Sequence, residues 1–350
     1  MSAVFRDLLR KVGSGNHTSQ SLSRTEAAIA AKMMLLAEAT PAQIGAFLIA
    51  HRIKRPTGEE LAGMLDTFEG FGPKFQPVSS QRPVIVFGIP YDGRSRTAPI
   101  SPITALLLAS VEQPVIMHGG GRLPTKYGLP LIEIWQGLGV DWTRLSLTQN
   151  QNILEKVGIG FIYTPLHFPL TNHLWEYRDQ LGKRPPLATM ELIWCPYAGN
   201  AHQISGFVHP PTEGMFLEAW KLRGVQQFTT IKGLEGSVDL PCDRTAIIGL
   251  GNGNGEITRL HLSASQHGFK HQNVALTTTS EFIHNILELL DGRNNILTES
   301  AIWNGGFYLW RCGICEDITT GIQKAELLFS SGAVSNTLIN LRNHCLPNNS

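Results

Sequence analysis

Two glycine-bearing loops carry the residue types that could hold a phosphate group. The first loop spans residues 88–96 and follows the apolar run at residues 83–87. Backbone N–H groups of such a loop can approach an anion closely, and arginine binds phosphate well. An ordinary strand-to-helix turn would have the same composition, so both interpretations stay open. The candidate anion-binding residues of this loop are Gly88, Asp92, Gly93, Arg94 and Arg96.

The second loop begins at His118 and continues through three consecutive glycines. Three glycines in a row are costly in conformational entropy, which favours close approach of the backbone to a ligand or to another segment. A flexible loop with solvated cations is the alternative interpretation. The candidate ligand-binding residues of this loop are His118, Gly119, Gly120, Arg122 and Lys126.

Other chemical signals are weaker. Cys312 and Cys315 have the spacing of a metal or redox pair, but a second pair is missing and the surrounding sequence is helical. Residues 249–255 are glycine-rich like a phosphate loop, yet the Lys-Ser/Thr pair is missing, and the Asn-Gly steps favour a hairpin turn. The sequence has neither a Ser/His/Asp arrangement nor a His-Glu-x-x-His motif.

The two loops must lie at the carboxyl ends of strands, where α/β proteins bind their ligands. Strand and helix patterns alternate here, which favours a parallel sheet. A later pair of strands flanks the Asn-Gly steps and is expected to be antiparallel. The sequence therefore predicts an α/β fold with a mixed, mostly parallel central sheet. The predicted strands are residues 83–87, 114–117, 158–163, 245–250 and 257–262, and the predicted helix after the first is residues 104–109.

The first seventy residues predict a small, all-helical unit. Each of three helices starts with a capping box. In this motif the hydroxyl of the first residue accepts from the backbone N–H three positions later, and the acid or amide side chain there accepts from the N–H of the first residue. These boxes are Ser23–Glu26, Thr40–Gln43 and Thr57–Glu60. The Pro/Gly-bearing residues 71–83 predict a linker. Near the other end, residues 318–341 predict a helix that breaks at Ser331-Gly332.

Composition restricts the class of protein. The chain has 350 residues, with 29 Lys and Arg against 28 Asp and Glu, so the net charge of +1 argues against a polybasic protein. No apolar run approaches the roughly 18 residues of a membrane span. The charged N-terminus is unlike a signal peptide, and five cysteines fit a reducing compartment. We expect a cytoplasmic protein that does not contact a membrane.

Several segments resemble the anthranilate phosphoribosyltransferase family. The resemblance covers nearly the whole chain and is most specific in the N-terminal helices. The matching segments are Leu22-Ser-Arg-Thr-Glu26, Glu38-Ala-Thr-Pro-Ala-Gln-Ile-Gly-Ala-Phe-Leu48, Glu59-Glu-Leu-Ala-Gly63, His118-Gly119 with Lys126 and Gly128, Tyr163-Thr-Pro165, Pro169, Arg178, Leu181-Gly-Lys-Arg184 and Ser331-Gly332-Ala333.

The resemblance implies a fold of two domains and a homodimer formed through the helical domain. Residues 1–76, with a middle segment near 165–185, would form the helical domain. Residues 77–164 and 186–346 would form the α/β domain, and the ligand cleft would lie between the two. The family's fold is that of glycosyltransferase family 3 and of type III nucleoside phosphorylases.

The resemblance also implies a reaction. The family transfers a phosphoribosyl group from phosphoribosyl pyrophosphate to the amine of anthranilate, a step of tryptophan biosynthesis that uses Mg²⁺. Such an enzyme holds the diphosphate and positions the amine, which is already a nucleophile. The two glycine-bearing loops and Ser101 would bind this small phosphorylated ligand. Arg178 would bind the acceptor, and Glu235 with Asp239 would hold the metal.

The chain departs from the family at these same positions. The family's Gly-Thr-Gly-Gly-Asp loop is Gly88-Ile-Pro-Tyr-Asp92 here, and Pro90 removes an N–H donor. The family's paired Asp-Glu becomes Val238-Asp239, with Glu235 nearby, and Phe168 replaces a histidine. These changes predict a divergent paralogue with degraded phosphoribosyl pyrophosphate and metal motifs.

Three functions are compatible with the sequence. The first is a phosphoribosyltransferase acting on an aromatic amine. The second is a non-catalytic paralogue that binds nucleic acid or another phosphate-containing ligand, because Lys232-Gly-Leu-Glu-Gly236 resembles such paralogues. A patch of Arg94, Arg96, Arg122, Lys126, Lys183 and Arg184 could then bind the polyanion. The third, a pyrimidine nucleoside phosphorylase, shares the fold.

Overall fold

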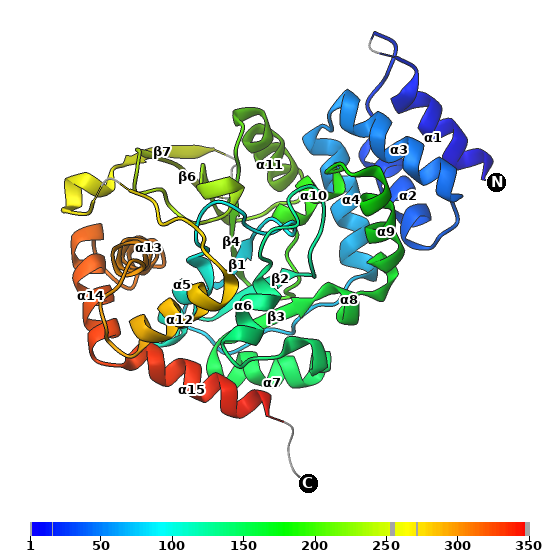
Figure 1. Ribbon diagram of the computed structural model, residues 1–350. Helices are drawn as coiled ribbons and strands as arrows, with labels where there is room; N and C mark the ends of the chain where they lie inside the picture. The colour runs from blue at the N-terminus through cyan, green and yellow to red at the C-terminus, as the bar shows by residue number, and fades with distance from the viewer. Residues whose placement is uncertain (1, 16, 253–255, 271, 347–350) are drawn as a thin grey trace.

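A helical bundle lies against one side of a larger α/β unit in the computed structural model (Figure 1). The structure describes residues 2–15, 17–252, 256–270 and 272–346. The three predicted capping boxes are all formed, so the predicted starts of α2, α3 and α4 are confirmed. A further helix precedes them, capped by the Ser2 side chain, which accepts from the N–H of Phe5. The bundle consists of α1 (Ala3–Gly13), α2 (Arg24–Leu35), α3 (Pro41–Lys54) and α4 (Gly58–Phe71).

A seven-stranded sheet forms the centre of the α/β unit, in the order β3-β2-β1-β4-β5-β6-β7. Strands β3, β2, β1, β4 and β5 are parallel, whereas β6 pairs with β5 and β7 in antiparallel fashion. The predicted mixed, mostly parallel sheet is confirmed. The predicted hairpin turn at residues 253–255 lies outside the described residues. The strands are β1 (Val84–Gly88), β2 (Val115–Gly119), β3 (Ile159–Tyr163), β4 (Ala201–Gly206), β5 (Gln227–Ile231), β6 (Ala246–Asn252) and β7 (Ile257–Leu262).

Helices cover both faces of this sheet. The predicted break near the C-terminus is confirmed, because Gly332 has a φ of 75° between two helices. The remaining helices are α5 (Ser101–Ala109), α6 (Leu131–Gly137), α7 (Leu147–Val157), α8 (Thr164–His167), α9 (Asn172–Leu181), α10 (Leu187–Met190), α11 (Pro210–Leu222), α12 (Thr279–Leu290), α13 (Thr298–Arg311), α14 (Ile318–Ser330) and α15 (Ala333–Cys345). Five short 3₁₀ turns are η1 (Trp142–Arg144), η2 (Pro169–Thr171), η3 (Glu191–Ile193), η4 (Leu234–Gly236) and η5 (Ala264–His267).

Two hydrophobic cores lie on opposite faces of the sheet. Because side chains alternate along a strand, Ile85 and Phe87 of β1 enter one core with α5, α6, α13 and α15. Val84 and Val86 enter the other core, which is continuous with the helical bundle and α11. The bundle is therefore anchored to the sheet by shared apolar packing. None of the described helices is long and apolar enough to cross a bilayer.

The strand order reverses between β1 and β4, and this reversal determines where a ligand site can form. The chain runs outward from β1 through β2 to β3, then returns to β4 on the other side of β1. Ligands bind at such a switch point, outside the carboxyl ends of the strands. The loops that follow β1, β2 and β5 meet there, and the segment from α8 to η3 lies beside them (Figure 1).

Candidate functional site

The loop after β1 directs one arginine into the protein. The Arg94 side chain is 3% exposed, and its guanidinium donates to oxygen atoms of its own loop and of the segment after β5. Nη1 donates to Asp239 Oδ2 and to Ser237 Oγ, each at 2.7 Å, and Nε donates to Glu235 Oε1 at 3.3 Å. Nη2 donates to Thr97 Oγ1. The two carboxylates predicted to hold a metal are therefore bound by an arginine of the predicted phosphate loop.

Glu235 is the most highly coordinated carboxylate of this cluster. Its backbone is left-handed, with a φ of 54°, in the turn η4 after β5. The N–H groups of Arg96 and Thr97 donate to Oε1 at 3.0 Å, and Lys126 Nζ lies 3.1 Å from Oε2. Burial by itself raises the pKa of Glu235, but Lys126, these N–H groups and Arg94 together hold it well below its usual value. Glu235 is therefore ionised at neutral pH.

Tyr91 fills the space between the loop after β1 and α9. Its side chain is buried, and its hydroxyl lies 2.6 Å from Nδ1 of His118, a hydrogen-bond distance. Its ring stacks on Trp175 with a centroid separation of 5.9 Å and an interplanar angle of 18°. A Cβ at Gly120 would lie 2.1 Å from the Trp175 ring, so the ring packs there because residue 120 has no side chain. Burial lowers the pKa of His118 to about 3, which keeps the imidazole neutral.

The predicted acceptor residue, Arg178, forms a buried ion pair. Its Nη1 donates to both carboxylate oxygens of Glu191, at 2.8 Å and 3.0 Å. Burial raises the pKa of Glu191 although Arg178 lowers it. The cavity among these groups, Tyr91 and Trp175 has a volume of about 10 Å³. Because a cavity of about that size holds one water molecule, no aromatic acid fits beside Arg178 in this arrangement.

Three predicted site residues take part in packing between segments. A Cβ at Gly88 would lie 1.7 Å from the carbonyl oxygen of Leu192, so this glycine permits close approach of η3. Gly93 has a φ of 72°, and the backbone of Gly128 passes directly against it. The carbonyl of Gly119 accepts a hydrogen bond from Thr164 Oγ1 at 3.1 Å. Gly88 and Gly93 thus have a structural reason to be glycine that is independent of a ligand, whereas a Cβ at Gly119 would make only ordinary contacts.

Asp92 and Ser101 are also buried. Asp92 pairs with Arg184, which follows α9. Ser101 is the first residue of α5 and is 1% exposed, and its hydroxyl has no hydrogen-bond partner among the described residues. Neither side chain presents a polar atom at the surface. Asp92 therefore connects the loop after β1 to the segment after α9, whereas the Ser101 hydroxyl is enclosed without a partner among the described residues.

A row of cations lies along the rim of the site, between the bundle and the α/β unit. Arg52 of α3 donates to the carbonyl of Arg184 at 3.0 Å. Arg184 in turn pairs with Asp92. Burial lowers the pKa of Lys126, and the nearby charge of Arg184 lowers it further. Arg96 Nε lies 3.9 Å from Glu235 Oε2, the oxygen that also pairs with Lys126. We call this row, with the exposed Lys183, the basic strip: Arg52, Arg96, Lys126, Lys183 and Arg184.

Two residues of the predicted basic patch are placed differently. Arg94 is buried, as described above. Arg122 is exposed, but its guanidinium donates twice to Glu133, at 2.8 Å and 2.7 Å, and once to the carbonyl of Tyr127. The structure therefore brings together Arg96, Lys126 and Arg184 of that patch.

The residues at the predicted metal site do not fit a divalent cation as they are arranged. Glu235 and Asp239 both direct oxygen atoms to Arg94, whose guanidinium lies between them. Among the described residues, no three His, Cys, Asp or Glu side chains come together as metal ligands. Cys312 and Cys315 follow α13, and burial raises the pKa of both thiols, that of Cys312 to about 12. Both are therefore protonated at neutral pH, unlike reactive thiolates.

Sequence reasoning missed several residues that shape the site. Ser237, Trp175 and Glu191 each complete a contact described above, and none carries a distinctive local motif. Tyr91 was visible only as a replacement for a family glycine. Its partners His118 and Trp175 lie 27 and 84 positions away in the chain, so only the fold shows that they meet.

Comparisons with known proteins agree with this fold. The helical bundle domain of a glycosyl transferase family matches residues 6–70, and the family's α/β domain matches residues 92–335. Anthranilate phosphoribosyltransferase of Chromobacterium violaceum is 25% identical over 88% of this chain and 89% of its own length. The Xanthobacter autotrophicus enzyme of the same name is 25% identical over 94% and 93%.

Solved structures have the same fold. The Saccharomyces cerevisiae anthranilate phosphoribosyltransferase in complex with phosphoribosyl pyrophosphate and Mg superposes with a TM-score of 0.84, at 15% identity, over 99% of this chain and 98% of that one. The Thermus thermophilus enzyme has a TM-score of 0.81 at 19% identity, over 97% and 99%. With both domains matched in order, the chain belongs to the glycosyl transferase family that includes the anthranilate phosphoribosyltransferases.

Proposed function

We propose that this chain is a non-catalytic member of its family that binds nucleic acid along the basic strip. One observation carries the proposal. The space beside Arg178 is filled by the chain's own side chains, while the cations at the rim of the site still face solvent. A polyanion can reach the rim without entering the filled space.

The charge balance of the rim supports an anionic ligand. Arg94 and three cations of the basic strip, Arg96, Lys126 and Arg184, pair with the three carboxylates of Asp92, Glu235 and Asp239, and Arg52 and Lys183 of the strip add further positive charge. The carboxylates are buried beneath the strip, whereas the Arg96 side chain is 78% exposed. An approaching phosphate therefore meets the cations first. Lysine and arginine bind the nucleic-acid backbone in this way, with little dependence on sequence.

The filled interior argues against phosphoribosyl transfer at this site. A transferase must place an amine against the ribose carbon and stabilise the departing diphosphate. Here Tyr91 and Trp175 occupy the space beside Arg178, and Arg178 is neutralised by Glu191. Pro90 also removes one N–H donor from the loop. The geometry supports binding at the rim better than chemistry in the interior.

Binding of a fluorescent oligonucleotide, measured by anisotropy as a function of salt, tests the proposal. The wild type should bind, and the logarithm of its affinity should fall with the logarithm of salt by about 0.7 per phosphate contacted. The double variant Arg96→Glu/Lys183→Glu should weaken binding at least tenfold. Arg293→Glu, an exposed arginine on another surface, is the matched control and should bind normally. Equal affinity of all three proteins would contradict the proposal.

A second candidate is magnesium-dependent transfer of a phosphoribosyl group to an aromatic amine, in tryptophan biosynthesis. The transferase function is favoured by the 25% sequence identity to two anthranilate phosphoribosyltransferases, over 88% and 94% of this chain. Calorimetric titration with phosphoribosyl pyrophosphate, with and without Mg²⁺, distinguishes the two. Magnesium-dependent binding in the micromolar range would favour the transferase. Absence of heat up to millimolar ligand, with folding confirmed, would retire it.

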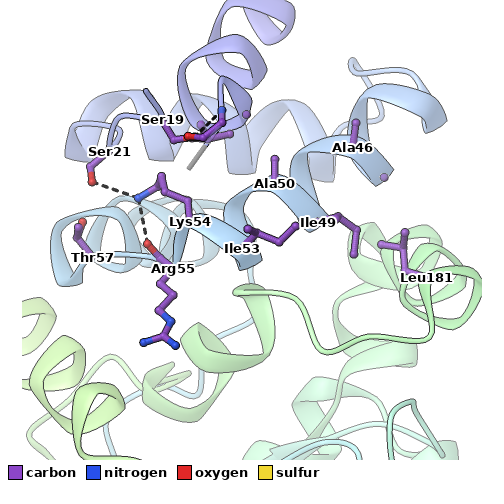
Figure 2. Close-up of a pocket in the computed structure, with 14 residues that line it drawn as sticks. Ser19, Ser21, Ala46, Ile49, Ala50, Ile53, Lys54, Arg55, Thr57 and Leu181 are labelled. Carbon is purple, nitrogen blue, oxygen red and sulfur yellow. Dashed lines mark hydrogen bonds between the residues drawn. The ribbon is translucent and has the colours of Figure 1, made fainter. Parts of the chain in front are cut away.

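For either function we propose a cytoplasmic homodimer formed through the helical bundle. A groove with a volume of about 1010 Å³ lies between α3, the segment before α2, and Leu181 of α9. Figure 2 shows the side chains that line it. Its floor is an apolar stripe on one face of α3, and Ile53 on that stripe is 66% exposed. Analytical ultracentrifugation should detect a dimer, and Ile53→Lys should shift it to monomer. A wild-type monomer at micromolar concentration would contradict this assembly. The stripe consists of Gly45, Ala46, Ile49, Ala50 and Ile53.

A further inference from the structure

The atoms that surround Arg94 are those that a hard divalent cation prefers. Four oxygen atoms accept from its guanidinium, two from carboxylates and two from hydroxyl groups. Magnesium and manganese take oxygen ligands of this kind, commonly two carboxylates with the remaining positions filled by water or phosphate. These oxygens belong to Thr97, Glu235, Ser237 and Asp239.

The backbone holds these carboxylates in place independently of Arg94. Asp239 Oδ2 accepts from the N–H of Ile100 at 3.0 Å, and Glu235 Oε1 accepts from the N–H groups of Arg96 and Thr97. Asp239 is 1% exposed, and no donor among the described residues reaches its second oxygen, Oδ1. The oxygen set is thus preformed and retains one unused, buried carboxylate oxygen.

The charges also match. Arg94 and Lys126, the two cations closest to Glu235 and Asp239, together bring two positive charges to the two carboxylates, and the exposed Arg96 lies farther away, at 3.9 Å. A divalent cation would bring the same charge at a single point. The guanidinium lies between the carboxylates, where it excludes such an ion sterically and by like-charge repulsion.

We propose that Arg94 is a built-in substitute for a divalent cation. The carboxylate pair of Glu235 and Asp239 is a latent metal site whose occupant is a side chain of the same protein. The wild type is accordingly indifferent to divalent ions, and removal of the Arg94 side chain opens the site. This inference goes beyond the proposed function and does not depend on it, because it concerns the buried carboxylates and not the basic strip.

Titration of the full-length protein with Mn²⁺ alone, followed by the electron paramagnetic resonance of free Mn²⁺, tests the proposal. Arg94→Ala should gain one Mn²⁺ site per chain, at least tenfold tighter than any binding by the wild type. The double variant Arg94→Ala/Asp239→Asn should lose that gain. Arg94→Lys, which keeps a cation, should not acquire the site.

Arg259→Ala provides a matched control. Arg259 also pairs with a largely buried carboxylate, donating to both oxygens of Glu213 at 2.8 Å and 2.9 Å, but among the described residues Glu213 is the single carboxylate that it contacts. Removal of Arg259 should therefore produce no Mn²⁺ site. If Arg259→Ala gained an Mn²⁺ site of equal affinity, any carboxylate that loses its arginine would suffice, and the proposal would be overturned.

Two further results also decide the proposal: Mn²⁺ binding by the wild type, and the folding of Arg94→Ala. Wild-type binding of Mn²⁺ that disappears in Asp239→Asn would show that Arg94 does not exclude the metal. If Arg94→Ala does not fold in buffer, it is refolded with and without Mn²⁺. Folding that requires Mn²⁺ would support the latent site, and failure to fold in both conditions would overturn it. Loss of oligonucleotide binding in any of these variants has no bearing on this result.

Discussion

Two buried glutamates, Glu60 in the helical bundle and Glu235 at the switch point, have similar surroundings and different partners. Glu60 accepts from the N–H groups of Leu22 at 2.8 Å and Thr57 at 2.7 Å, and it pairs with Lys54 and His51. Glu235 likewise accepts from backbone N–H groups and from cations, as described above. Burial by itself raises the pKa of both carboxyl groups. In both, hydrogen bonds and positive charges outweigh burial and lower the pKa, which is about 2 for Glu60.

The difference lies in the exposure of the cations. The Lys54 side chain is 9% exposed, so the charge of Glu60 is paired inside the bundle. Around Glu235, the Lys126 side chain is 20% exposed and that of Arg96 is 78% exposed. The first cluster joins α3 to α4 and to the segment before α2. The second joins loops and leaves positive charge at the surface, where a ligand can use it.

The largest effect is expected for Glu60→Gln. The substitution leaves Lys54 without its counter-charge, and removal of one partner from a buried ion pair typically costs about 3–5 kcal/mol. Denaturant unfolding followed by circular dichroism should show a loss of this order. Glu59→Gln, one position earlier and exposed, is the control and should change stability by less than about 1 kcal/mol. A loss at Glu60 no larger than at Glu59 would show that the cluster is not structural.

Tyr91→Ala comes next, because it removes a large buried ring from the region around Glu235. Truncation of a buried aromatic side chain to alanine costs about 3–5 kcal/mol, part of it for the cavity that remains. Tyr91→Phe keeps the ring stacked on Trp175 and loses the hydroxyl contact with His118 alone, which is worth about 1 kcal/mol. Denaturant unfolding of both variants distinguishes packing from hydrogen bonding. Equal losses would assign the role of Tyr91 to its hydroxyl.

The same comparison shows what the sequence can predict. Glu60 was found in the sequence because its capping partner, Thr57, lies three positions away and the pattern is local. The helix starts, β1, β2 and the break at Gly332 were predicted for the same reason. Glu235 was proposed through a resemblance, and its pairing with Arg94, 141 positions earlier, could not be foreseen. No local periodicity specifies which loops of a sheet meet, so Arg94 was expected at the surface.

The pH dependence of stability distinguishes the two regions further. His118 has a pKa of about 3 in the folded protein, below the ordinary value of 6.5, because it is buried. As pH falls below 6.5 the unfolded chain takes up a proton and the folded chain does not, so stability falls by about 1.4 kcal/mol per pH unit until the folded pKa is reached. His118→Gln should remove that slope between pH 6 and pH 4.

The control for this measurement is His284→Gln, since His284 is exposed on α12. Unfolding free energies of wild type and variants are compared at each pH, so that contributions from other buried histidines, such as His202, cancel. An unchanged slope in His118→Gln would mean that His118 is protonated in the folded protein. Its contact with Tyr91 would then need a different assignment of the donor.

The smallest effect on stability is expected for Arg96→Ala. This variant gives the sharpest contrast between the exposed cation partner of Glu235 and the largely buried cation partner of Glu60. Arg96 lies 3.9 Å from Glu235 and is exposed, and an ion pair of that kind contributes at most about 0.5 kcal/mol. Loss of Lys54, the largely buried partner of Glu60, should cost several times more, because solvent screens that pair much less. Arg96→Ala should nevertheless reduce the salt dependence of oligonucleotide binding by about one phosphate contact. A stable variant with unaltered salt dependence would remove Arg96 from the ligand surface and leave the basic strip to Arg52, Lys126, Lys183 and Arg184.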